Sequence, residues 1–306
     1  MADLRSRLPA HSLMQQTLAL HPPGFNVPSG EALSWYKGAL GEIAVAGVLA
    51  WLPSEFTVLH SVPIGEQGTD IDHVVIGPPG VFTINTKSHP GQSLWIGGHG
   101  LLVSGQHTNY IGKAAQEASR ASTRLSSASG LTVPVQPLIV FVNPGSRTVK
   151  ALPEGGVRVL ADWELLGHLN GLRREFSAEQ LEEIAAAASR SETWCSAPPA
   201  VVDARRLAIH FNAIVARNLQ GAQSADAPLP TPRMETRIDT VVPARGRDFV
   251  RAAPHRQKAA ASRPRSRGRA KKSVWQELVK AALFIGVAWF GLTVGLPAYL
   301  ATIVTP

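Results

Sequence analysis

The chain has very little cysteine: a single residue, Cys195, occurs among its 306 residues. One cysteine forms no intrachain disulfide and builds no zinc site from thiolates, so both kinds of cross-link are excluded. This scarcity is typical of a protein from a reducing compartment. Cys195 follows Trp194 and has no histidine near it in the sequence, which favours a packed thiol over a nucleophile.

Three common nucleotide and hydrolase motifs are also missing. The sequence contains no Gly-x-x-x-x-Gly-Lys-Ser/Thr phosphate loop and no Gly-x-Ser-x-Gly nucleophile elbow. The glycine-rich segment Gly97-Gly98-His99-Gly100 lacks the strand-then-helix context of a dinucleotide site. These absences argue against a P-loop NTPase, a serine hydrolase of the α/β type and a dinucleotide-binding enzyme.

Charge is missing from the last 26 residues, 281–306, which are mostly apolar. Because about 20 apolar residues cross a bilayer core as a helix, the sequence predicts a single-pass transmembrane anchor within 273–306. Trp275 and Tyr299 lie near its two ends, where aromatic anchors are common. A buried helix of a soluble domain is the alternative.

Positive charge is concentrated directly before this segment. Residues 245–272 hold 11 Lys or Arg residues and one acidic residue, whereas residues 1–244 hold 18 basic and 20 acidic residues. The net charge of +8 therefore comes from a tail and gives no support for a basic DNA groove in the folded part. A basic run beside an apolar anchor predicts a cell-membrane protein with a cytoplasmic N-terminal part. It also predicts contact with anionic lipids, with nucleic-acid binding by the same run as the alternative.

Periodicity along the rest of the chain predicts a mixed α/β fold. Apolar residues recur at helical spacing over 34–52 and 109–127, with short β-rich runs between and after them. The expected strands are 56–62, 69–76, 81–87, 93–96, 101–104, 136–142 and 157–160, followed by helices at 163–169, 178–189 and 202–219. This order predicts a mixed central sheet flanked by helices.

Five regions follow from these patterns. They are an N-terminal extension with one short helix (1–29), an α/β domain (30–160), a helical extension (161–219), a disordered basic linker (220–272) and the transmembrane anchor (273–306). The linker is assigned because apolar periodicity is lost there and the composition turns to Ala, Pro, Arg and Ser.

Two neighbouring strands carry the polar residues of greatest interest. Asp72 lies in the first, and Asn85 and Lys87 lie in the second, of two strands joined by the turn 77–80. Side chains two apart in a strand share a face, so Asn85 and Lys87 point the same way, and Asp72 can join them from the neighbouring strand. An acid, an amide oxygen and an ammonium group in one small space are the parts of a metal-dependent phosphodiester-cleaving site.

Four short motifs in the first half of the chain carry a family resemblance. They are Gly41-Glu42, Ile71-Asp72-His73-Val74-Val75-Ile76, Gly80-Val81-Phe82-Thr83-Ile84-Asn85-Thr86-Lys87 and Gln116. Together they resemble the nuclease-related domain (NERD), a branch of the PD-(D/E)xK nuclease-like superfamily, over roughly residues 37–160. The resemblance implies a restriction-endonuclease-like fold that uses Mg²⁺ or Mn²⁺.

The resemblance also implies a role for each residue. Asp72 would be the central carboxylate ligand of the metal, and Glu42 a second carboxylate that holds metal or water. Asn85 stands where the superfamily more often has Glu or Asp, so its amide oxygen would bind the metal without adding negative charge. Lys87 would orient or help deprotonate the attacking water, and Gln116 would contact the substrate backbone.

The resemblance therefore predicts hydrolysis of phosphodiester bonds in nucleic acid, DNA more than RNA, on the cytoplasmic side of the membrane. The alternative is a nuclease fold without turnover that acts as a binding or scaffold protein, which the uncharged Asn85 and the acidic balance of residues 1–244 favour. We expect Asp70 to flank the site. We expect His73, on the face opposite Asp72, to pack in or near the core. The sequence leaves the oligomeric state open.

Overall fold

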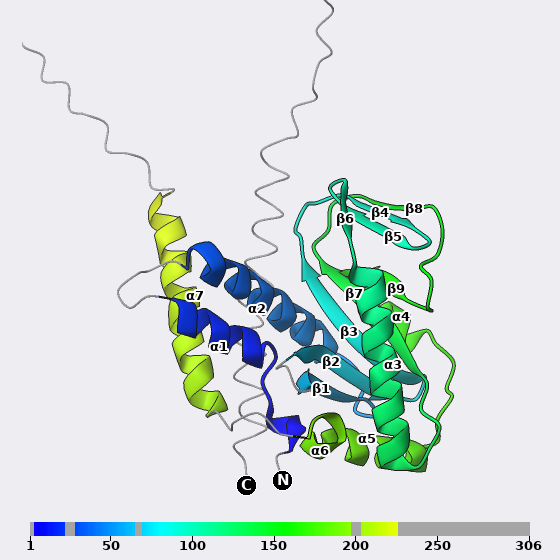
Figure 1. Cartoon of the computed structure of the whole chain (residues 1–306). Helices are drawn as coiled ribbons and strands as arrows, with labels where there is room; N and C mark the ends of the chain where they lie inside the picture. Colours follow the sequence, from blue (N-terminus) through cyan, green and yellow to red (C-terminus); the bar gives the residue numbers. More distant parts are fainter. Residues whose placement is uncertain (1–2, 22–27, 65–68, 197–202, 226–306) are drawn as a thin grey trace, which may run out of the picture.

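The computed structural model describes residues 3–21, 28–64, 69–196 and 203–225. These residues form a mixed α/β fold in which a central five-stranded sheet lies between helices (Figure 1). The predicted transmembrane anchor and most of the predicted linker lie outside the described residues. Within the described ranges, no helix is both long and apolar enough to span a bilayer.

The central sheet has the strand order β1-β2-β3-β7-β9. Its strands are β1 (Thr57–Pro63), β2 (Asp70–Gly77), β3 (Gly80–Ser88), β7 (Val135–Val142) and β9 (Arg158–Ala161). The first three form an antiparallel meander, whereas β7 runs parallel to both β3 and β9. The connection from β3 to β7 includes the helix α3 (Tyr110–Ser129). The prediction of a mixed sheet flanked by helices is confirmed.

A smaller sheet stands at one end of the central sheet (Figure 1). In the order β6-β5-β4-β8, its strands are β6 (Gln106–Thr108), β5 (Gly100–Val103), β4 (Leu94–Gly97) and β8 (Arg147–Val149). The sequence predicted β4 and β5 but not β6 and β8. Both missed strands have three residues and are mostly exposed, so no alternation of apolar side chains marks them.

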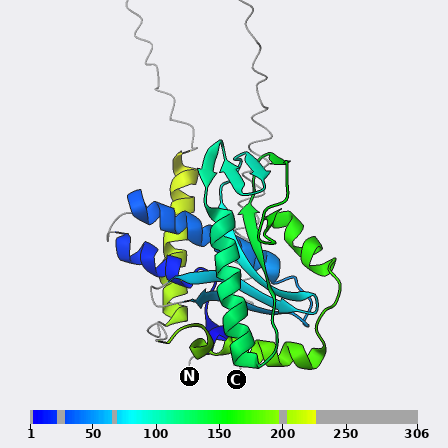
Figure 2. The ribbon, with the colours of Figure 1, turned by 45° about the vertical axis from the view of Figure 1, so that its right-hand side comes forward.

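Helices cover both faces of the central sheet (Figure 2). On one face lies α2 (Gly30–Leu49), whose Val45 and Leu49 are buried in a cluster with strand residues. On the other face lie α3 and α5 (Ala178–Ser189), and Leu125 of α3 belongs to the cluster there. Two separate apolar clusters thus fix α2 and α3 on opposite sides of the same strands.

The helix α3 shows how its sequence selects the face that packs. Its buried residues are spaced three or four apart and are Ile111, Ala114, Ala118, Ala121 and Leu125. This spacing produces a single apolar stripe toward the sheet. The helix ends at Gly130, whose φ of 73° is left-handed and favours glycine.

The turn between β2 and β3 depends on a glycine for space. A Cβ atom added at Gly77 would lie 2.1 Å from a ring atom of Phe56. Because an aromatic ring packed that closely leaves no room for a side chain, β2 can end under Phe56 only with glycine at this position.

The N-terminal residues pack against the rest of the fold. The remaining helical elements are η1 (Leu4–Ser6), α1 (His11–Leu20), η2 (Asp162–Glu164), α4 (Leu165–Asn170), α6 (Ser191–Trp194) and α7 (Ala204–Ala225). Leu4 is buried in the cluster of the α3 face, and Leu8 and Met14 are buried in a cluster with α2 and α7 residues. Cys195 is a buried free thiol, which confirms the prediction of a packed cysteine.

Candidate active site

The candidate site lies where β2 and β3 separate. The pairing of these strands ends at His73 opposite Ile84. Beyond that pair, Oδ2 of Asp72 accepts a hydrogen bond from the backbone N–H of Thr86 at 2.6 Å. A side-chain carboxylate thus satisfies a strand donor that the neighbouring backbone leaves open, and Asp72 is held between the two strands.

Glu42 reaches the same point from α2. Its side chain is buried, and its carboxyl group lies near the backbone N–H of Ala10 and the carboxyl group of Asp72. Burial, followed by the charge of Asp72, raises the pKa of Glu42 well above its usual range. Burial also raises the pKa of Asp72, although Lys87 and the N–H of Thr86 oppose this shift. Two neighbouring carboxyl groups, both with raised pKa values, mark a place where negative charge is concentrated and a cation would be favoured.

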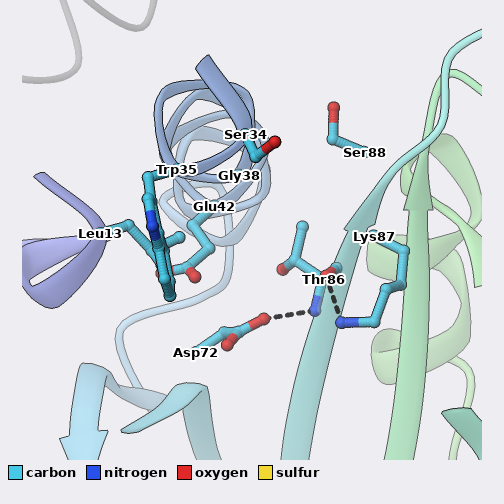
Figure 3. Close-up of a pocket in the computed structure, with 9 residues that line it drawn as sticks. All are labelled: Leu13, Ser34, Trp35, Gly38, Glu42, Asp72, Thr86, Lys87 and Ser88. Atoms are coloured by element: carbon cyan, nitrogen blue, oxygen red, sulfur yellow. Dashed lines mark hydrogen bonds between the residues drawn. The ribbon is translucent and has the colours of Figure 1, made fainter. Parts of the chain in front are cut away.

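Lys87 and Asn85 contact each other across one intervening residue of β3, as the alternation of a strand predicts. Nζ of Lys87 donates to the backbone carbonyl of Thr86 at 3.0 Å and to Oδ1 of Asn85. Nζ also stands 5.0 Å from the ring centroid of Tyr110, a cation–π distance. These contacts keep the ammonium group where its charge acts on Asp72 (Figure 3).

Glu117 on α3 extends this set of polar contacts and was not predicted from the sequence. Nδ2 of Asn85 donates to Oε2 of Glu117 at 3.5 Å, so the Asn85 amide links Glu117 to Lys87. Burial, followed by the charge of Asp72, raises the pKa of Glu117 to about 8. Oε1 of Glu117 is buried with no hydrogen-bond partner among the described residues. The two contacts of Asn85 orient its amide, with the oxygen toward the lysine and the nitrogen toward the acid.

Helical spacing was the signal that could have identified Glu117. It lies three residues after the buried Ala114 and four before the buried Ala121, so it shares the stripe that faces the sheet. Gln116, the predicted substrate contact, is its exposed neighbour. A role for Gln116 in substrate binding stays a prediction.

Asp70 flanks the site, as predicted, and is held by the N-terminal segment. Its Oδ2 accepts hydrogen bonds from Nη2 of Arg7 at 3.0 Å and from the hydroxyl of Ser12. The side chains of Arg7 and Asp70 are each 12% exposed. The charge of Asp70 contributes to the raised pKa values of Glu42 and Asp72.

A buried histidine pair lies next to the site. His73 packs in the core, as predicted, and its Nδ1 is 2.9 Å from Nδ1 of His60 on β1. Burial lowers the pKa of His60 to about 4 and the pKa of His73 well below its usual range. Both imidazoles are therefore neutral at physiological pH.

The site opens into a pocket of about 370 Å³ (Figure 3). The residues that line it are Leu13, Ser34, Trp35, Gly38, Glu42, Asp72, Thr86, Lys87 and Ser88. The helices α1 and α2 form one wall, and β3 forms the opposite wall. Asn85 is not among the lining residues, because its amide is engaged between Lys87 and Glu117.

The donor chemistry fits a divalent cation that keeps several of its waters. Mg²⁺ is commonly held by one or two carboxylates together with substrate phosphates. Glu42 and Asp72 provide two neighbouring carboxyl groups on the pocket lining, and both could hold such a cation. Among the described residues, no group of three or more His, Cys, Asp and Glu side chains has the spacing of a metal site, so no all-protein cage is present there. Asn85, predicted as a further ligand, directs its oxygen to Lys87.

Comparison with known proteins assigns the part of the chain that holds these residues. Residues 37–142 match the family described as the nuclease-related domain. The match covers 106 of the 306 residues of the chain. An uncharacterized protein of Bacillus anthracis is 43% identical over 67 residues, which are 21% of this chain and 30% of that protein. No solved structure matches the chain.

The nuclease-related domain contains the polar part of the site but not the whole pocket. The polar residues inside the matched range are Glu42, Asp72, Asn85, Lys87 and Glu117. The pocket residues that precede it are Leu13, Ser34 and Trp35. One wall of the pocket is therefore formed largely by residues outside the family match.

Proposed function

We propose that the nuclease-related domain hydrolyses phosphodiester bonds of nucleic acid, DNA more readily than RNA, with Mg²⁺ or Mn²⁺. The observation that carries this proposal is the convergence of the buried Glu42 and the half-buried Asp72 with the side chain of Lys87 in one open pocket. The family match over residues 37–142 supports the same activity.

Each side chain is suited to one task in this reaction. Glu42 and Asp72 would hold the cation, which when bound neutralises phosphoryl oxygens and lowers the pKa of a bound water. Lys87 lies at the edge of the pocket, where its charge offsets the negative charge that develops on phosphorus during in-line attack. Asn85 and Glu117 position Lys87 from the side that does not line the pocket.

The order of the elements supports a restriction-endonuclease-like architecture for the domain. The helix α2 is followed by the antiparallel meander β1-β2-β3, then by the crossover helix α3 and the parallel strand β7. The carboxyl groups and the lysine gather where β2 and β3 separate, which places the chemistry on the central strands of the sheet.

A second function rests on Asn85. An amide in place of a carboxylate brings no negative charge to a cation, so binding of the metal is weakened. In this alternative the domain lacks turnover and serves as a nucleic-acid or protein scaffold at the membrane.

Cleavage of DNA by the purified full-length protein with Mn²⁺ tests the first function. We expect Asp72→Ala to abolish cleavage, because it removes a carboxylate ligand and leaves Glu42 alone in the site. Glu182→Ala, which changes an exposed carboxylate on α5, is the matched control and should cleave normally. Cleavage that survives in Asp72→Ala contradicts the site. An intact protein that neither cleaves DNA nor binds Mn²⁺ in calorimetry supports the scaffold.

A membrane location completes the proposed function. The uncharged residues 281–306 are long enough to cross a bilayer, and the basic run 245–272 favours a cytoplasmic side for everything before it. The same run would attract anionic lipids. The nuclease-related domain would therefore act at the cytoplasmic face of the cell membrane.

A further inference from the structure

The wall of the site pocket that belongs to α2 carries an aromatic side chain. Trp35 lines the pocket beside Leu13, seven residues before Glu42 on the same helix and with Gly38 between them. Residues at this spacing follow one stripe of a helix. Seven helical residues rise about 10 Å along the axis. Trp35 and Glu42 therefore line the same side of the pocket, about two turns of α2 apart (Figure 3).

The indole of Trp35 is not used as part of a core. Its neighbours Tyr36 and Ala39 are buried in the cluster with α1 and α7, whereas Trp35 belongs to none of the apolar clusters of the described residues. Nε1 of Trp35 donates to Oε1 of Glu31 at 3.3 Å, one turn earlier in α2. This contact uses the one polar atom of the ring, so the surface left for a ligand is apolar.

The opposite wall of the pocket has a different chemistry. Thr86, Lys87 and Ser88 line it, and Asp72 lies at its base (Figure 3). An aromatic ring on one wall, an ammonium group on the other and carboxyl groups between them suit a ligand that joins a flat ring to a phosphate. A nucleotide unit of nucleic acid has this chemistry, and a pocket of about 370 Å³ falls within the size range of sites for such ligands.

The state of the strand decides whether a base can reach this ring. In a duplex, neighbouring bases cover both faces of each base, so a single base becomes accessible only when it leaves the stack. In a single strand, every base offers a free π face, and aromatic side chains bind such faces with little dependence on sequence. A pocket with one aromatic wall therefore favours unpaired bases.

We propose that Trp35 stacks on an unpaired base next to the phosphate held at Lys87, so that the domain acts on single-stranded or locally unpaired nucleic acid. This inference rests on the proposed function for its substrate class and adds the state of the strand. Trp35 is a specificity-determining residue and takes no part in bond cleavage.

Binding to the full-length protein without added divalent cation tests the inference, with fluorescence anisotropy of labelled strands as the readout. We expect Trp35→Ala to bind a single strand about tenfold or more weakly, the loss typical of one base–aromatic stack. Its affinity for an abasic strand of the same length, which keeps the phosphates, should be unchanged. Trp35→Phe keeps a ring and should retain most of the affinity for the base-bearing strand.

The matched control is Trp51→Ala. Trp51 is 68% exposed, follows the other end of α2 and does not line the pocket, so its removal should leave both affinities unchanged. Equal binding by the wild type and Trp35→Ala, or an equal loss on the abasic strand, overturns the inference. Because no bond is cut in this assay, cleavage without a Trp35-dependent preference removes this inference alone. Trp35-dependent base binding without cleavage under Mn²⁺ removes the proposed hydrolysis alone.

Discussion

Asn85 shows how one residue redistributes charge within the site. A carboxylate at this position would place its negative charge directly against Lys87, but the amide oxygen that contacts the lysine is neutral. The amide nitrogen of Asn85 donates instead to the carboxyl group of Glu117. The carboxyl group that residue 85 lacks thus stands one hydrogen bond further away, on α3.

Exchanging the acid and the amide tests this arrangement. We expect Asn85→Glu alone to impair Mn²⁺ binding and cleavage about tenfold, because it places a second carboxylate against Glu117. Glu117→Gln alone should cause a similar loss, because it replaces the carboxyl oxygen that accepts the Asn85 N–H with a group that also donates. The double variant should recover much of both losses, because the amide then at position 117 would donate to the carboxylate at position 85, and that carboxylate would pair with Lys87.

Calorimetry with Mn²⁺ and cleavage rates measure these effects in parallel. Ser119→Ala, an exposed change on the same helix, is the control for α3 and should behave as the wild type. Losses that simply add in the double variant would show that residues 85 and 117 act independently.

At the scale of elements, β1 and β2 are joined by more than their backbone ladder. His60 and His73 lie opposite each other in the register of these strands, and their rings meet edge to face at 5.1 Å between centroids. One Nδ1 must donate and the other accept, so the pair requires at least one neutral ring and is lost when both rings are protonated. The residue next to His73 is Asp72, so the pair supports the strand segment that presents the site carboxylate.

The pH dependence of unfolding tests this pairing. The pKa of His60 is about 4 in the fold, below the usual value of 6.5. Between pH 4 and pH 6.5, His60 is therefore protonated in the unfolded chain but not in the folded chain. Stability should therefore be fully present above about pH 6.5 and should fall as the pH drops toward about 4, by on the order of 3 kcal/mol for His60. His60→Gln should flatten this slope, whereas His107→Gln, at an exposed position, should not. Urea unfolding across this pH range measures both slopes, and an unchanged slope in His60→Gln would count against the pair.

At the scale of the whole molecule, the N-terminal segment completes the nuclease-related domain. Arg7 bonds to Asp70 across 63 residues of sequence, and the backbone N–H of Ala10 lies near the carboxyl group of Glu42 and opposes the rise of its pKa. Both contacts are made by residues that precede the matched range 37–142. The site is therefore built by the N-terminal segment together with the family domain.

Fractionation of cells that produce the full-length protein tests the membrane proposal. The full chain should stay in the membrane after an alkaline carbonate wash, because an apolar helix of about 20 residues is held by the bilayer core. A chain that ends at residue 272 keeps the basic run and should bind vesicles with anionic lipids in a salt-sensitive way. A chain that ends at residue 225 should neither stay in the membrane fraction nor bind vesicles with anionic lipids. Release of the full chain by carbonate would contradict the anchor.

Much of the fold was predictable because its signals are local. The runs of β-branched and apolar residues in β2, β3 and β7 and the capping box of Ser177 with Gln180 at α5 each depend on residues close in sequence. The helix α2 begins at Gly30, with Ser29 as its N-cap, four residues before the predicted start at residue 34. The strands β6 and β8 were missed because three exposed residues carry no periodic signal.

From the residues alone, the site was predictable only where a strand alternates, whereas Glu42 was predicted from the family resemblance. Asn85 and Lys87 share a face because they are two residues apart, and their contact followed from this spacing alone. Glu117 escaped the prediction because its partner Asn85 is 32 residues away and reaches it only once α3 packs on the sheet. The aromatic wall at Trp35 likewise depends on how α1 and α2 meet β3.

The sequence by itself determined the mixed α/β class, the positions of Asp72, Asn85 and Lys87 on adjacent strands, and the separation of a basic, apolar tail from a slightly acidic folded part. Only the tertiary structure decided which acid faces the lysine and which residues close the pocket. The physical reason is the separation in sequence over which each signal acts. Periodicity and charge act between near neighbours in the chain, whereas burial, shifted pKa values and a pocket wall arise when distant elements pack together.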